Sequence, residues 1–156
     1  MDAVIFFASI RTRCDKMNPV FFFLMFSSGA LISYIMVSDS NKKCASSRAA
    51  HELSKTIEET IRVSRAPFDE IIEDYLHRED GKLAVRALIE SDDEEIKKLI
   101  GKIRSSDLDA ALSYAELLKN YTEKEMRKVN KKEALTRKAK ITLPTALTLL
   151  IAILLL

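Results

Sequence analysis

Histidines beside carboxylates are the first residues in this sequence that could do chemistry. The chain has two histidines, His51 and His77. Glu73 and Asp74 precede His77 at helical spacing, and Glu52 follows His51 directly. A metal centre built on helices needs two acid–histidine pairs from facing helices, and this sequence supplies only one. We therefore expect both histidines to be exposed residues in ion pairs rather than metal ligands.

Neighbouring acids could bind a divalent cation or work as a paired acid and base. The acidic run at residues 92–95 lacks the alternating ligands and the glycine of a calcium loop. It fits the start of a helix instead, because Ser91 and Glu94 match a capping box and acids favour a helix N-terminus. The acidic pairs at residues 58–59 and 69–70 are expected to lie on solvated helix faces.

No catalytic motif occurs in the chain. It has no glycine-rich phosphate loop, no Gly-x-Ser-x-Gly sequence and no Cys–His arrangement. We therefore expect no enzyme, no cofactor, and no catalytic, cofactor-binding or metal-binding residue.

Basic residues concentrate at residues 124–140. Aromatic residues are not interleaved with them, and an apolar stretch follows directly, so nucleic acid is not an expected partner. One interpretation is contact with anionic lipid headgroups, worth about 1 kcal/mol per base. The other is a solvated spacer beside a membrane. The basic residues concerned are Lys124, Arg127, Lys128, Lys131, Lys132, Arg137, Lys138 and Lys140.

Two charge-free apolar stretches, residues 19–37 and 141–156, enclose the charged part of the chain. A globular protein in water spaces its apolar residues periodically, because each element has one wet face. A helix needs roughly 20 apolar residues to cross about 30 Å of hydrocarbon. The first stretch has that length, the second is marginally short, and the lipid bilayer is therefore an expected partner.

The first apolar stretch fits either a retained signal anchor or a cleaved secretory signal. Arg11, Arg13 and Lys16 would form the basic n-region, and small residues at Ser38 and Ser40 would permit cleavage after Ser40. The stretch is longer than the roughly 7–15 residues of a typical signal core, which favours retention. Translation could also start at residue 17, a methionine.

The apolar stretch at residues 141–156 fits either a tail anchor or the signal for a glycosylphosphatidylinositol (GPI) anchor. Asn130 or Ala134 could be the attachment site, although neither has both the small followers and the spacer that attachment favours. The two cysteines, Cys14 and Cys44, cannot provide a disulfide framework if the first is removed with a signal.

Two signals disagree about which side of the membrane the charged middle occupies. The triplet at Asn120, followed by Tyr121 and Thr122, is a candidate N-glycosylation site and suits the lumen or exterior. The basic residues that follow the first apolar stretch and precede the second favour the cytosol.

The middle of the chain has a helical pattern throughout. Apolar residues recur at helical spacing from residue 46 to about 132, and glycines and prolines are few, three of each. We expect helix boundaries at Pro67 as a first helical residue, at Gly81 as a stop, at Ser91 and Ser106 as starts, and at Thr122 as a new cap.

The sequence thus predicts an all-α protein: a bundle of three to five short amphipathic helices between an N-terminal apolar helix and a C-terminal apolar tail helix. The expected segments are a signal or anchor region (1–40), a helical domain (41–120), a basic juxtamembrane segment (121–140) and an apolar tail (141–156).

Our first functional hypothesis is a non-catalytic, membrane-anchored protein of the secretory pathway or cell surface that binds another protein. The alternative is a two-span or tail-anchored organelle protein with a cytosolic adaptor or assembly domain. Homo-oligomers are compatible with both, because so small a core has little stability of its own.

Overall fold

The structure, a computed structural model, describes the backbone of residues 19–155 and the side chains of residues 23–151. Five α-helices joined by short connections make up this part of the chain, which contains no strand. The predicted all-α class is confirmed. The residues before position 19, among them Arg11, Arg13, Cys14 and Lys16, lie outside the described part.

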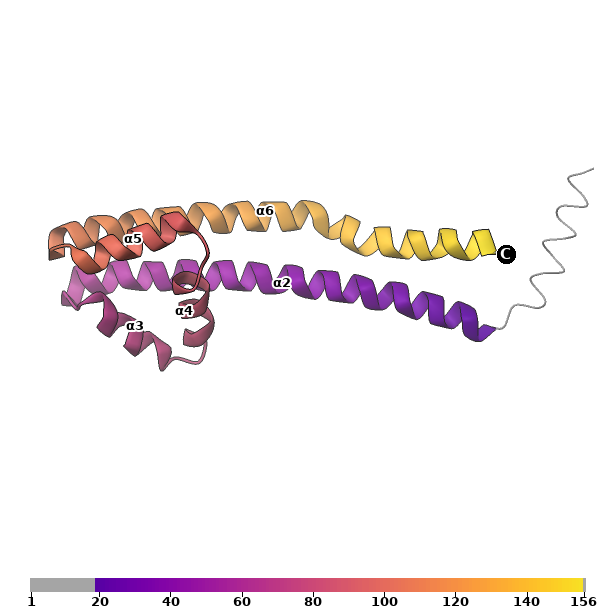
Figure 1. Ribbon diagram of the computed structural model, residues 1–156, viewed down its shortest axis with the longest axis horizontal. Helices are drawn as coiled ribbons and strands as arrows, with labels where there is room; N and C mark the ends of the chain where they lie inside the picture. Colours follow the sequence, from indigo (N-terminus) through magenta and orange to yellow (C-terminus); the bar gives the residue numbers. More distant parts are fainter. Residues whose placement is uncertain (1–18, 156) are drawn as a thin grey trace, which may run out of the picture. The chain divides into compact units, whose positions relative to one another are not determined.

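Two of the helices are long and three are short (Figure 1). The long ones are α2 (Pro19–Ser64) and α6 (Leu108–Leu155), and the short ones are α3 (Phe68–Leu76), α4 (Gly81–Ile89) and α5 (Glu94–Ser105). The three short helices fall within the predicted number, but the apolar stretches are not separate helices. Residues 19–37 begin the 46-residue α2, and residues 141–155 end the 48-residue α6. Residues 38–45 and 134–140 contain no glycine or proline, so nothing there stops a helix.

The chain forms two compact units, each containing parts of α2 and α6. We call residues 19–40 with 134–155 the apolar unit, and residues Asn41–Glu133 the helical domain.

All five helices contribute apolar side chains to the core of the helical domain. Leu53, Ile57 and Leu118 are buried at its centre, and the four-residue spacing of Leu53 and Ile57 places these two on one face of α2. Buried side chains of α3, α4, α5 and α6 complete this core: Phe68, Ile71, Ile72, Ala84, Leu88, Ile96, Ile100, Ile103, Ala111 and Ala115. Helices α3, α4 and α5 are therefore held against α2 and α6 by one continuous core.

The helix ends differ by a few residues from the predicted ones. Arg65, the residue after α2, has a φ of 55°, a left-handed conformation, and Pro67 is the N-cap of α3 rather than its first residue. Gly81 starts α4 instead of closing α3. A Cβ atom at Gly81 would overlap the Tyr75 carbonyl oxygen, so the turn between these helices requires glycine.

Two predicted caps are also corrected. Asp93, not Ser91, caps α5: its Oδ1 accepts a hydrogen bond from the Glu95 backbone N at 3.0 Å. Ser91 Oγ instead accepts a bond from the Asp93 backbone N at 3.2 Å. No helix begins at Thr122, because α6 continues through it and the side chain is buried in the core of the domain.

Candidate functional site

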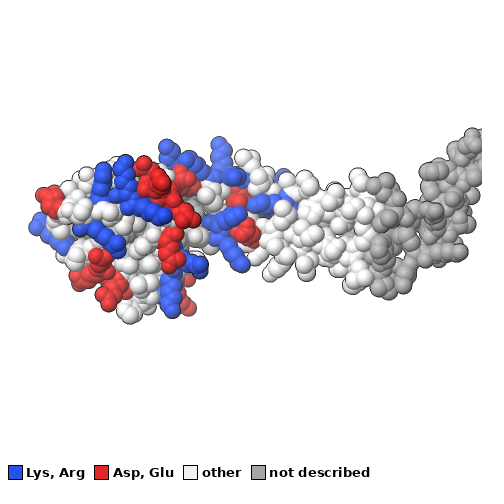
Figure 2. Space-filling view, in the orientation of Figure 1, with Lys and Arg blue, Asp and Glu red and all other residues white. Residues whose placement is uncertain are grey.

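The apolar unit carries large apolar side chains on its outside and small side chains inside. Among its described residues the buried ones are Gly29, Ser33 and Ser40. Phe23 and Tyr34 are 75% and 74% exposed. Further exposed large side chains are Leu24, Phe26, Leu31, Ile32, Ile35, Met36, Leu135, Ile141, Leu143, Leu147, Leu149, Leu150 and Ile151. This arrangement is the reverse of a protein core in water. Figure 2 shows part of the surface without blue or red side chains, as the charge-free stretches require.

One helix of the described part is long and apolar enough, by length and composition, to cross a membrane. This helix is α2, and only 11% of its most apolar 18-residue window is buried. A core helix of a globular protein would be mostly buried. The predicted association with a membrane is supported to this extent.

Within the apolar unit, α2 and α6 pack against each other in antiparallel order. A Cβ atom at Gly29 would lie 2.8 Å from Thr148 Cγ2, so glycine is what allows this approach. Ser33 Oγ lies 3.0 Å from the Gly29 carbonyl oxygen and 3.4 Å from that of Ile141. Lys140 Nζ donates to Ser40 Oγ at 3.3 Å. Small residues one turn apart are typical of close helix pairs in membranes.

Several hydroxyl groups of the apolar unit are hydrogen-bonded to their own helices. Ser27 and Ser28 donate to the carbonyls of Leu24 and Met25 at 2.9 and 2.7 Å. Thr145 donates to the Ile141 carbonyl at 3.1 Å. Polar groups that are satisfied within the helix can enter a medium without water at low cost.

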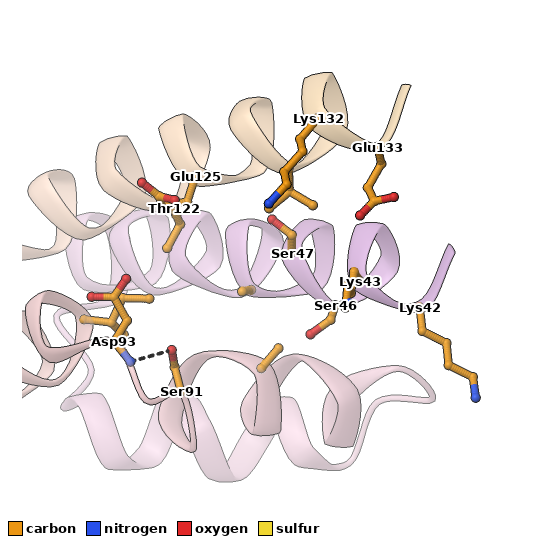
Figure 3. Close-up of a pocket in the computed structure, with 14 residues that line it drawn as sticks. Lys42, Lys43, Ser46, Ser47, Ser91, Asp93, Thr122, Glu125, Lys132 and Glu133 are labelled. Atoms are coloured by element: carbon orange, nitrogen blue, oxygen red, sulfur yellow. Dashed lines mark hydrogen bonds between the residues drawn. The ribbon is translucent and has the colours of Figure 1, made fainter. Parts of the chain in front are cut away.

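A pocket of about 670 Å³ lies in the helical domain, between α2, α6 and the end of α4 (Figure 3). Its polar lining consists of three lysines, three carboxylates and four hydroxyl residues: Lys42, Lys43, Lys132, Asp93, Glu125, Glu133, Ser46, Ser47, Ser91 and Thr122. Its apolar lining consists of Ala50, Ala87, Ile96 and Val129. The formal charges of the lining therefore cancel.

One wall of this pocket is fixed by Asp93. Tyr121 Oη donates to Asp93 Oδ2 at 2.8 Å, which ties the start of α5 to α6. The hydrogen bond to the Asp93 carboxylate, reinforced by burial and by nearby negative charge, raises the pKa of Tyr121 to about 12. The phenol therefore stays protonated over the physiological pH range.

Buried hydroxyl groups join α2 to α6 beside the pocket. Ser54 and Thr122 are 0% and 3% exposed, and their hydroxyl oxygens lie 2.6 Å apart. One hydroxyl donates to the other, and the second is then free to donate to a carbonyl of its own helix, either Ser54 to His51 at 2.7 Å or Thr122 to Lys119 at 3.0 Å. His51 is half-buried, and its Nδ1 lies 3.4 Å from Thr122 Oγ1. The expectation that His51 is an exposed residue in an ion pair was therefore wrong.

Glu58 is a buried carboxylate, which corrects the expectation that it lies on a solvated face. Its side chain is 4% exposed, and Oε2 lies 3.1 Å from Lys119 Nζ. Arg62 contacts Glu58 Oε1 and lies 2.6 Å from Glu116 Oε1. The expectation holds for Glu59, whose side chain is 60% exposed. Sequence spacing could have flagged Glu58, because it follows Ile57 on the buried face that includes Ser54 and Ile61.

The predicted basic residues lie along α6 and belong to both units. Arg127 pairs with Glu123 at 2.5 Å and Lys128 with Glu125 at 2.6 Å, so part of the positive charge is balanced locally. Lys131, Arg137 and Lys138 are exposed, and Lys140 contacts Ser40 as described. The described residues contain no group of three or more His, Cys, Asp or Glu side chains that could hold a metal ion.

The two predicted processing residues are both on helices. Ser40 lies in α2 and is 5% exposed. Asn120 is exposed on α6, but Thr122 of the same triplet is buried.

No known protein family model, curated protein or solved structure matches this chain.

Proposed function

We propose that this chain is a two-span membrane protein whose apolar unit forms a helical hairpin in the bilayer. The helical domain acts without catalysis, as an interaction or assembly domain on the cytosolic side. The observation that carries the proposal is the reversed apolar unit, with exposed Phe, Leu and Ile side chains around a Gly29–Ser33–Ser40 seam. Such a surface is stable in hydrocarbon and costly in water.

The proposed sidedness rests on the distribution of bases. Because the two apolar segments are antiparallel, the chain between them leaves and re-enters the bilayer at the same side. Lys42, Lys43 and Arg48 follow the first segment, and five bases precede the second: Lys131, Lys132, Arg137, Lys138 and Lys140. Only three bases precede residue 19. Positive residues flanking membrane spans tend to stay in the cytosol.

Two observations favour the two-span protein with a cytosolic domain over a cleaved and glycosylated ectodomain. Cleavage after Ser40 would cut α2 within a helix and remove half of the hairpin. Thr122, the threonine of the Asn120 triplet, is hydrogen-bonded to Ser54 inside the domain. This contact explains the threonine without glycosylation.

The interaction role rests on the acidic outer face of α3. Asp69, Glu70, Glu73 and Asp74 are all exposed there, and Asp69 is paired with Arg104 at 2.8 Å. We propose that a basic protein surface binds this face, since complementary charge guides association.

Glycosylation in microsomes tests the sidedness. The variant Arg78→Asn with Asp80→Thr creates an acceptor triplet in the exposed turn between α3 and α4, where burial cannot hide it. We expect this variant and the natural chain to remain unglycosylated and to stay in the membrane pellet after carbonate extraction.

The positive control fuses a cleavable secretory signal directly to residues 41–156 of the same variant, so that the first apolar segment is absent and the domain is directed into the lumen. Glycan on the variant without that signal would place the domain in the lumen and reject the cytosolic proposal. Release of the chain by carbonate would reject the hairpin itself.

A further inference from the structure

A second pocket of the helical domain, of about 220 Å³, lies where the ends of α2 and α5 meet the starts of α3 and α6. The floor of this second pocket is apolar and buried, and it consists of Ile61, Phe68, Ile103 and Ala111. An apolar cavity of about 150 Å³ can hold a benzene molecule. The second pocket therefore has room for one large apolar side chain.

The charged residues that line the second pocket are two arginines and one aspartate, Arg65, Arg104 and Asp69. Arg104 Nη2 lies 2.8 Å from Asp69 Oδ1, and Arg104 Cζ lies 5.1 Å from the centroid of the Phe68 ring. These contacts hold the Arg104 guanidinium in place, and its other N–H groups can still donate. Arg65 is exposed and has no ion pair with any described residue. The second pocket thus offers two guanidinium groups to a carboxylate, which arginine binds through paired hydrogen bonds.

The backbone conformation of Arg65 favours glycine rather than arginine. Its φ of 55° is left-handed, which is unfavourable for a residue with a Cβ atom. A glycine would make the same turn between α2 and α3 without this strain. Strained residues of this kind cluster at sites that bind ligands. The turn alone gives no reason for an arginine here, whereas a guanidinium group at the second pocket does.

We propose that the second pocket binds the C-terminal residue of a partner polypeptide, and that this residue is apolar. Its side chain lies on the apolar floor, and its terminal carboxylate lies beside Arg65 and Arg104. A C-terminal residue carries both groups on one Cα, so both can reach a single small pocket, whereas neighbouring side chains of an extended internal segment point to opposite sides. The inference rests on the proposed interaction role of the helical domain and names a chemical feature of its partner.

Calorimetric titration of the full chain in detergent micelles with three short peptides tests the proposal. The first is an acetylated tetrapeptide, glycine-serine-glycine-leucine, with a free terminal carboxyl group. The second is the same peptide with a terminal amide, and the third has glycine in place of the leucine. We expect the first to bind about tenfold or more tightly than the others, because one lacks the charged acceptor and the other lacks the side chain that becomes buried.

Two pairs of variants locate the site. Arg65→Gly removes a guanidinium group and Ser106→Leu fills the second pocket, so each should weaken binding of the first peptide about tenfold. Arg78→Gly and Ser105→Leu make the same changes at exposed residues outside the pocket and should leave binding unchanged. Circular dichroism melting follows the fold of all four. Arg65→Gly should lose binding while gaining stability, so the test remains valid if Ser106→Leu unfolds.

Equal binding of the acid and the amide, or undiminished binding by Arg65→Gly, would overturn the carboxylate site. An equal loss in Arg78→Gly would also overturn it, because the attraction would then follow net charge alone. Tighter binding of an amidated peptide that ends in leucine-aspartate would identify an internal acidic segment as the ligand and overturn the C-terminal partner.

A parallel titration separates failure of this site from failure of the proposed function. An amidated lysine-rich peptide has no carboxylate, so it tests only the acidic face of α3. Its binding should weaken in the double variant Glu70→Gln with Glu73→Gln. If this peptide binds and the leucine peptide does not, the second pocket is refuted and the proposed interaction face stands. If neither binds, both are refuted.

Discussion

Loss of Lys119 should destabilise the helical domain strongly, because it leaves a buried charge with one partner fewer. Glu58 is 4% exposed and its Oε2 lies 3.1 Å from Lys119 Nζ. Removing one member of a buried ion pair costs about 3–5 kcal/mol when the remaining charge has no other partner. Arg62 still contacts Glu58, so we expect Lys119→Met to cost about 2–3 kcal/mol.

Hydrogen exchange of the full chain in detergent micelles measures this effect. A loss of about 2–3 kcal/mol should speed exchange of core amides in α2 and α6 by about 30- to 150-fold. Lys55→Met is the matched control, since Lys55 and Glu59 are 50% and 60% exposed and 3.8 Å apart. It should change stability by less than about 0.5 kcal/mol.

The double variant Glu58→Leu with Lys119→Met separates the buried charge from lost packing. It removes both charges and should recover most of the stability, because an apolar pair of similar volume needs no partner. The reasoning is wrong if Lys119→Met exchanges no faster than Lys55→Met. It is also wrong if the double variant is as unstable as Lys119→Met alone.

Four further outcomes follow from single positions. Arg65→Gly should stabilise the domain by up to about 1 kcal/mol, measured by chemical unfolding, because glycine adopts the left-handed conformation without strain; equal or lower stability would contradict this. Gly29→Leu should separate the hairpin helices, seen as a loss of crosslinking between cysteines placed on them. Gly101→Ala should stabilise α5 by about 0.5–1 kcal/mol, because a Cβ at this position meets nothing within 4 Å. The pKa of Tyr121, raised to about 12 by Asp93, predicts stability that is intact below pH 10, the ordinary tyrosine pKa, and declines as pH rises toward 12; in Tyr121→Phe this decline should be reduced, and an unchanged alkaline profile would contradict the assignment.

The helical stripes could be predicted from sequence because apolar periodicity follows directly from having one buried face. Leu53, Ile57 and Ile61 recur every four residues, which predicts one apolar helix face, and all three are buried. The extent of the long helices could not be predicted this way. Residues 38–45 and 134–140 have no stripe, and only the absence of a breaker allows α2 and α6 to continue through them.

Polar residues of the site were harder to foresee because their roles depend on contacts between distant helices. Thr122 has the spacing of a cap, yet it bonds Ser54 across 68 positions of sequence. Asp93 has two functions, since one oxygen caps α5 and the other accepts from Tyr121. Neither partner is implied by the local sequence.

The pairing of the first and last helices determines when the protein can be completed during synthesis. Ser33 and Ile141 are separated by 108 positions, and Glu58 meets Lys119 only after 61 more residues have followed it. The ribosome therefore releases α2 long before its partner exists, and both the Gly29–Ser33 seam and the buried carboxylate wait uncovered. A chain interrupted before α6 would leave both surfaces open, so quality-control factors would meet an uncovered seam of small residues and a carboxylate that lacks its Lys119 partner.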